Sequence, residues 1–101
     1  MQSEGIKMDD SQAVLVTTVH RGVFFGYLPA NADRSQKTLT LKNCRNAIYW
    51  AGSRGFLGLA SHGPDGGSRI GTRAPEVMLH DITSVTSVSD AATMKWEKYA
   101  S

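Results

Sequence analysis

Aromatic rings and positively charged groups lie close together in the middle of the chain, between positions 44 and 69. Flat aromatic rings stack on nucleobases, and the guanidinium fork of arginine binds phosphate. These residue types in one segment therefore predict a surface that binds a small nucleotide. The side chains we expect to form it are Arg45, Tyr49, Trp50, Arg54, His62 and Arg69.

Each of these side chains also has an ordinary structural use. Tyr49 and Trp50 are adjacent, and adjacent residues of a strand face opposite sides, so at most one of them joins the core. Exposed arginines are more often solvated than bound to an anion. Among the arginines we favour Arg69, because it follows a glycine-rich loop and precedes an expected strand at Ile70.

The glycine-rich loop covers residues 62–68 and contains three glycines and a proline. Glycines let backbone amides approach a phosphate closely, and loops of this kind often carry binding sites. The spacing matches neither the P-loop nor the dinucleotide-binding fingerprint. The loop therefore supports an anion site without identifying a known one.

No catalytic or metal-binding pattern is complete in the sequence. The three histidines, His20, His62 and His80, are too far apart to give the close ligand spacings of a zinc site. No pattern identifies a base for the single cysteine, Cys44, so we assign it to packing. We expect a binding protein that uses no metal or cofactor and is not an enzyme.

The composition is that of one ordinary globular domain, with 41% hydrophobic and 20% charged residues among 101. A net charge of +2 is far below what binding to long nucleic acid requires. One cysteine excludes an intramolecular disulfide and fits a reducing cytoplasm. No apolar run is long enough to span a membrane. Because so small a domain buries little surface, we expect a homo-oligomer.

Strands dominate the first half of the predicted structure. After a polar leader over residues 1–12, which we expect to be disordered, the β-branched run 13–20 and the run 23–28 predict a hairpin. Alternating polar and apolar residues over 37–42 predict a third strand. Residues 47–50 predict a short fourth strand, which would carry the Tyr-Trp pair.

The second half mixes strands and helices. A compact apolar run over residues 56–60 predicts a short helix or turn on the sheet. Residues 76–80 and 81–88 predict two more strands, although apolar residues occur at every third position in the second. A bulge or bend near Asp81 would reconcile that spacing with a sheet.

The chain is expected to end in a short amphipathic helix. Ser89 is a good N-cap for residues 90–99, and Met94 and Trp96 are the large apolar residues of that segment. The sequence thus predicts one mainly β (α+β) domain over residues 13–101. We expect a small antiparallel sheet or partly open barrel, with a short central helix or turn and a short C-terminal helix.

Three short patterns occur in a fixed order: Arg-x-small-Ile-Tyr-Trp ending at Trp50, then Phe-Leu-x-Leu-Ala, then Ser-Arg-Ile-Gly ending at Gly71. This order resembles a family of small phage and prophage proteins of unknown function, over roughly Val14 to Ser89. No catalytic residues come with that family. The resemblance implies a phage origin, and small β-rich phage proteins without enzymatic motifs are often inhibitors or sponges that blunt bacterial defence.

The residues and the resemblance together lead to one functional hypothesis. We expect a phage anti-defence protein in the host cell cytoplasm that binds and sequesters a nucleotide immune signal, such as a cyclic nucleotide or an ADP-ribose derivative. The alternative is a protein-binding inhibitor of a host defence enzyme or nuclease, because aromatic and arginine residues also form protein-binding hot spots. The sequence does not separate these two.

Overall fold

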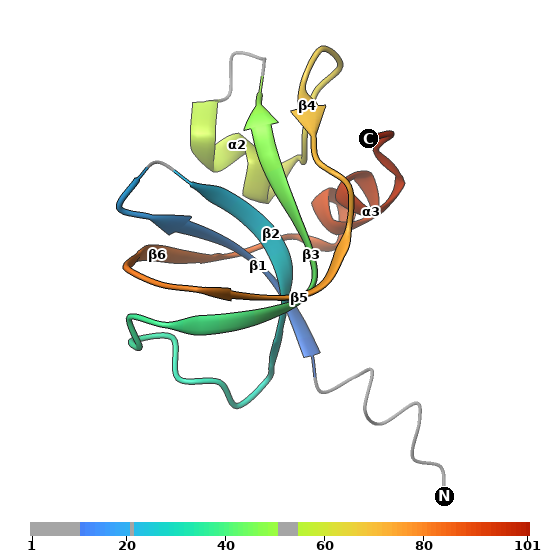
Figure 1. Ribbon diagram of the computed structural model, residues 1–101. Helices are drawn as coiled ribbons and strands as arrows, with labels where there is room; N and C mark the ends of the chain where they lie inside the picture. Colours follow the sequence, from blue (N-terminus) through green and yellow to red (C-terminus); the bar gives the residue numbers. More distant parts are fainter. Residues whose placement is uncertain (1–10, 21, 51–54) are drawn as a thin grey trace, which may run out of the picture.

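Six strands and two helices follow one another in the computed structural model, which describes residues 11–20, 22–50 and 55–101. Both helices lie on one side of a curved sheet (Figure 1). The predicted mainly β fold with a short central and a short C-terminal helix is confirmed. The elements are β1 (Ser11–Thr18), β2 (Val23–Pro29), β3 (Leu39–Tyr49), α2 (Gly55–Ser61), β4 (Arg69–Ile70), β5 (Ala74–Leu79), β6 (Ile82–Ser87) and α3 (Asp90–Lys98).

All the strand pairs are antiparallel, and the sheet has the order β4-β3-β2-β1-β6, with β5 also paired to β3. β5 and β6 are consecutive strands joined by His80 and Asp81. However, β5 pairs with β3 near one edge of the sheet, and β6 pairs with β1 at the opposite edge. A connection this short between the two edges requires a strongly curled sheet. The curl is visible in Figure 1, where β5 passes in front of β1 and β2.

The hairpin of β1 and β2 is confirmed, and it begins earlier than expected. Ser11 pairs with Pro29 at its open end. Gln12, which the sequence placed in the leader, donates from its side-chain amide to the Pro29 carbonyl at 3.1 Å and accepts a hydrogen bond from Arg34. Polar residues therefore extend β1 because their side chains find partners at this edge. Residues 1–10 of the expected leader lie outside the described residues.

β3 is one continuous strand, whereas the sequence predicted separate strands over residues 37–42 and 47–50. The polar residues between them form a bulge, where the register with β2 shifts. Asn43 takes a positive φ of 49° there, a conformation that asparagine tolerates better than most residues. On β2, a Cβ at Gly26 would lie only 2.8 Å from Leu41 Cβ, so glycine permits the close approach of the two strands.

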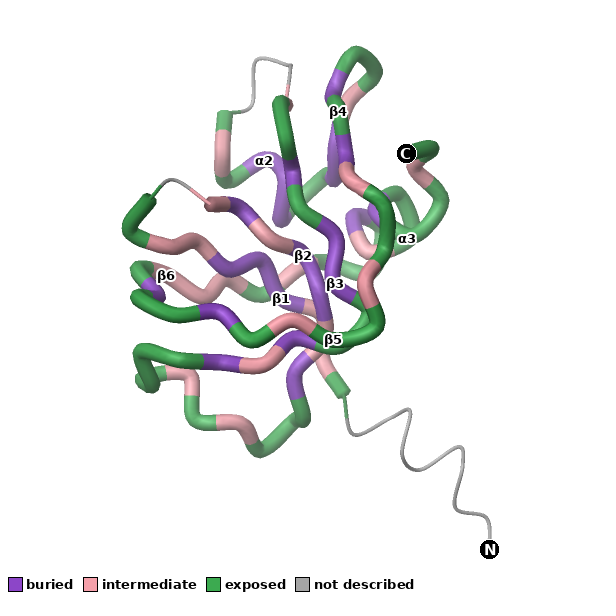
Figure 2. Tube along the Cα trace, viewed as in Figure 1, coloured by how far each residue is buried: buried purple, intermediate pink, exposed green. Residues whose placement is uncertain are grey.

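Buried side chains lie on both faces of the sheet. Val14, Leu15 and Val16 are fully buried, and they alternate between the faces, which explains why residues 13–16 in the middle of β1 are apolar without interruption. Figure 2 shows this buried stretch of β1. The strand cluster comprises Val14, Val16, Leu28, Leu39, Leu41, Cys44, Leu79 and Ile82. The helix cluster comprises Leu15, Val23, Phe25, Ala47, Leu59, Ala60, Ile70 and Trp96.

Trp96 anchors α3 to the sheet. Its ring stacks on Phe25 with centroids 5.0 Å apart and planes within 3°, and its Nε1 donates to the Leu59 carbonyl at 3.0 Å. Ala92 is the other buried residue of α3, whereas Met94 is 57% exposed. The helix is therefore amphipathic, and Met94 lies outside its buried face.

The start of α3 follows the predicted cap. The Ser89 hydroxyl accepts a hydrogen bond from the Ala92 amide at 3.1 Å and donates to the Ser61 carbonyl at 2.9 Å. One side chain thus satisfies an open donor of α3 and joins it to the last residue of α2. The Ser89 N-cap and the short helix predicted over residues 56–60 are both confirmed.

The predicted irregularity near Asp81 is also present. Asp81 has a φ of 56°, and the register between β1 and β6 shifts so that Thr18 pairs with Ile82 while Thr17 pairs with Ser84. Thr83 is therefore the extra residue of a bulge. This bulge accounts for apolar spacing that does not alternate along the strand.

Candidate functional site

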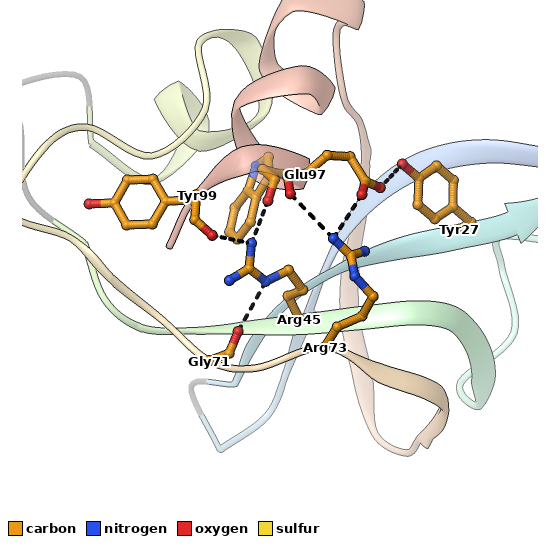
Figure 3. Close-up of polar contacts among 7 residues, drawn as sticks. Tyr27, Arg45, Gly71, Arg73, Glu97 and Tyr99 are labelled. Carbon is orange, nitrogen blue, oxygen red and sulfur yellow. Dashed lines mark hydrogen bonds and ion pairs between the residues drawn. The ribbon is translucent and has the colours of Figure 1, made fainter. Parts of the chain in front are cut away.

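Arg45 lies inside the protein, only 4% exposed. Its Nε donates to the Gly71 carbonyl at 3.0 Å, and its Nη1 donates to the carbonyls of Trp96 at 2.6 Å and Tyr99 at 2.8 Å (Figure 3). Burial lowers the pKa of this guanidinium from its ordinary value, and the nearby Arg73 lowers it further. Positive charge at the end of α3 also complements the helix dipole. The structure thus assigns Arg45 to joining β3 and α3.

Tyr49 and Arg69 are directly opposite each other on β3 and β4. Tyr49 is 57% exposed and Arg69 is also exposed. The preceding pair, Ala47 with Ile70, is buried and anchors the two strands. The register shift between these two pairs leaves Ile48 as an extra, exposed residue. Directly paired residues share one face of a sheet, so a ring and a guanidinium lie together at the surface.

Arg69 of this pair lines a hollow of about 510 Å³, and Tyr49 does not line it. The hollow lies between the end of β3, the segment around β4 and the last residues of the chain. Arg69 supplies a guanidinium to it, and Ser68 and Thr72 supply residues with hydroxyl groups. The arrangement can offer the Arg69 guanidinium to an anion, and the exposed ring of Tyr49 lies opposite Arg69 on the paired strand. The lining residues are Ile48, Ser68, Arg69, Ile70, Gly71, Thr72, Ala100 and Ser101.

Gly71 has a steric role at this hollow. Its amide donates to the Asn46 carbonyl at 2.8 Å. A Cβ at this position would lie 2.1 Å from Asn46 Oδ1. The glycine of the Ser-Arg-Ile-Gly pattern is therefore explained by the close approach of the β4 segment to β3.

Trp50 follows directly after β3 and lies on the other side of the chain from Tyr49. It is half-buried and packs against the helix cluster, whereas Tyr49 faces solvent. The structure thus offers Tyr49 as an exposed stacking platform. Trp50 contributes apolar contact to the core.

His62 and Arg54 do not extend the site. His62 is exposed at the end of α2, where its Nδ1 lies 2.7 Å from Ser61 Oγ, and it does not line the hollow beside Arg69. Arg54 lies outside the described residues. Of the six candidate residues, the structure brings Tyr49 and Arg69 together.

The glycine-rich loop is held by α3 and the residue that follows it. The Tyr99 hydroxyl lies 2.9 Å from the carbonyl oxygens of both Asp65 and Ser68. Gly63 has a φ of 87°, and a Cβ there would lie 2.8 Å from Lys95 Cβ. These contacts give Gly63 a packing role, whereas a Cβ at Gly66 would meet nothing within 4 Å.

A polar network that the sequence did not reveal lies near Arg45. The Tyr27 hydroxyl donates to the Glu97 carboxylate, and Arg73 Nη2 lies 2.8 Å from Glu97 Oε1 (Figure 3). Burial raises the pKa of Tyr27, and its hydrogen bond to Glu97 raises it further. The three residues come from β2, the segment before β5, and α3. No local pattern could have connected positions so far apart.

The described residues show no group of three or more histidine, cysteine, aspartate or glutamate side chains that could hold a metal ion. Cys44 is buried, and burial raises the pKa of its thiol to about 11. It is therefore protonated at neutral pH and is a poor nucleophile. Among the helices in the described part of the chain, none is long and apolar enough to cross a membrane.

Comparison with known proteins identifies a family for this chain. Residues 11–96 match the model of the family described as a domain of unknown function, DUF6948. No curated protein and no solved structure matches the chain significantly.

Proposed function

Because this chain belongs to the DUF6948 family, whose function is unknown, we propose its role from its surface: it binds a small nucleotide without catalysis. The observation that carries the proposal is the exposed cross-strand pair of Tyr49 and Arg69, of which Arg69 lines a hollow of about 510 Å³. In this arrangement the ring holds a base and the guanidinium holds a phosphate. The hydroxyl-bearing residues Ser68 and Thr72 border the same hollow.

The energies of such contacts suit reversible capture. Stacking of a base on an aromatic side chain contributes about 1 to 3 kcal/mol. The contact of exposed Arg69 with phosphate contributes less than a buried one, since solvent and salt screen it. Nucleotide affinity should therefore fall as ionic strength rises. A second copy of the chain covering the open hollow would enclose more of the ligand, which supports a homo-oligomer as the binding form.

The biological role we propose is sequestration of a nucleotide immune signal. In this proposal the protein is of phage origin and acts in the cytoplasm of the infected host. It holds a cyclic nucleotide or an ADP-ribose derivative and keeps it from the defence effector that the signal would activate. Sequestration requires tight binding at stoichiometric amounts, and it needs no catalytic group.

Native mass spectrometry tests this proposal with a panel of cyclic nucleotides and ADP-ribose isomers. A retained ligand, released unchanged by heat, supports sequestration, and the same spectra give the oligomeric state. Titration calorimetry should then show Arg69→Gln and Tyr49→Ala each weakening binding by about tenfold. Lys37→Gln is the matched control, because Lys37 is exposed and does not line the hollow. No binding across the panel, or equal effects of Lys37→Gln and Arg69→Gln, would overturn the proposal.

A second candidate function, inhibition of a host defence enzyme or nuclease by direct binding, is supported by exposed apolar residues. Ile48 and Tyr49 are each 57% exposed, and Leu57 on α2 is 64% exposed. The end of β3 and the start of α2 lie at the same end of the molecule (Figure 1). A stoichiometric complex with a purified defence nuclease, lost in Leu57→Asp and formed without any nucleotide, would favour this function.

A further inference from the structure

A larger hollow, of about 850 Å³, opens where β2 and β3 separate. The paired register of these strands ends at Tyr27 with Lys42. Beyond this pair β2 continues to Pro29, and β3 begins at Leu39 on the other side of the hollow. Asn43, which takes a positive φ in the bulge, directly follows Lys42, the β3 residue of this last pair. The separation is therefore built into the sheet.

The interior of this hollow is largely apolar. The residues Leu28, Pro29, Ala32 and Leu39 line it, together with Tyr27. A space of this volume and character accommodates a small organic molecule with a flat apolar body. The hollow shares no lining residue with the one beside Arg69. It is thus a separate place on the molecule.

Charged groups lie at one end of the hollow. Lys42 is paired across the strands with Tyr27, whose hydroxyl bonds to Glu97, so all three residues are near one another. The Glu97 carboxylate is already neutralised by Arg73 at 2.8 Å and bound by the Tyr27 hydroxyl. It therefore offers little net charge to a ligand.

Lys42 is the cation that a ligand can use. Its partner Glu76 lies on β5, and the two side chains are 63% and 54% exposed. An ion pair this exposed contributes little to stability, so exchanging the Glu76 carboxylate for an anionic group of a ligand costs little. The ammonium group also has a flexible stem that can turn toward the hollow.

From these observations we propose that the hollow between β2 and β3 binds an amphipathic organic anion. Its flat apolar body lies against Leu28, Ala32 and Leu39, and its anionic group pairs with Lys42. This site is independent of the nucleotide site, and either proposal can fail without the other.

The test uses two fluorescent probes that share an apolar body. Anilinonaphthalene sulfonate is anionic, and N-phenylnaphthylamine is its uncharged counterpart. We expect both to bind the full chain at one site, the anionic probe about tenfold more tightly. Lys42→Gln should remove that preference and leave the affinity for the uncharged probe unchanged. Near-UV circular dichroism establishes that each protein is folded, because the anionic probe also binds partly unfolded states.

Filling the hollow locates the probe. Ala32→Phe places a ring inside the hollow and should weaken both probes by about tenfold or more. Ala30→Phe is its control, since Ala30 is exposed and does not line the hollow. If Ala32→Phe does not fold, Thr40→Phe fills the same space from β3, where an aromatic residue suits a strand. If neither probe binds the wild type, or if binding survives both Ala32→Phe and Thr40→Phe, the proposed site is overturned. Equal affinities of the wild type for the two probes would overturn its anion preference.

Discussion

Arg45 Nη1 donates to the carbonyl of Trp96 at 2.6 Å, joining residues that are 51 positions apart. The same atom also donates to the Tyr99 carbonyl, so one buried side chain satisfies backbone acceptors at the end of α3. Through this contact the last helix becomes part of the sheet. A residue that the sequence offered as a phosphate ligand is instead a main support of the fold.

Replacing Arg45 should therefore destabilise the protein. Arg45→Met leaves the carbonyls of Gly71, Trp96 and Tyr99 without their donors, and we expect a loss of about 3 kcal/mol in the free energy of unfolding. Urea denaturation followed by circular dichroism measures it. Arg69→Met is the control and should change stability by less than about 0.5 kcal/mol, because Arg69 is exposed. Equal stability of the two variants would refute this role of Arg45.

Gly71→Ala should have effects of opposite sign in two backgrounds. In the wild type the new Cβ displaces the Asn46 side chain, and we expect a loss of about 1 kcal/mol. In an Asn46→Ala background the obstacle is absent, so the lower entropy of the unfolded alanine chain should stabilise the protein by about 0.5 kcal/mol. Thermal unfolding of the wild type, Gly71→Ala, Asn46→Ala and the double variant completes the double-mutant cycle. Gly66→Ala is the control, since a Cβ there meets nothing within 4 Å.

Asn43 should tolerate glycine better than a β-branched residue. Its φ of 49° is in the left-handed region, where a residue with a branched Cβ is strained. We expect Asn43→Val to cost about 1 to 2 kcal/mol and Asn43→Gly to cost little. Chemical denaturation of both variants gives the comparison. If valine and glycine are equally tolerated, the bulge does not depend on this backbone conformation.

Cys44 should make stability depend on pH under alkaline conditions. Burial raises its pKa from 9.0 to about 11 in the folded protein. Because the folded-state pKa is the higher one, the contribution of the thiol to stability is complete below pH 9 and is lost as the pH rises toward 11. Denaturation at a series of pH values should show a shallower decline for Cys44→Ala than for the wild type. Identical slopes would mean that Cys44 ionises equally in both states.

Local signals in the sequence were sufficient for much of the fold. The β-branched run of β1 and the Ser89 cap each depend on neighbours along the chain, and both were predicted. The continuity of β3 was missed because its bulge contains polar residues that are typical of a loop. The bulge is stabilised by β2 and β5 on either side, which no local pattern reveals.

The candidate site could be predicted only in part, for a similar reason. Tyr49 and Arg69 were named from their types, but only the pairing of β3 with β4 places them together. Arg45 looked equally suitable in the sequence, and its burial depends on α3. No sequence pattern indicated the contact between Tyr27 and Glu97, because these residues are 70 positions apart and meet only in the folded protein.

The position of β6 has a consequence for how the protein is made. β1 pairs with β2 on one side and with β6 on the other, and Val14 pairs with Ser87 near the far end of the chain. During synthesis β1 can form only its hairpin with β2 until β6 has left the ribosome. Its buried valines need the later strands for their cover. The sheet is therefore completed only after Ser87 has been translated, and long-range strand pairing of this kind makes folding slow.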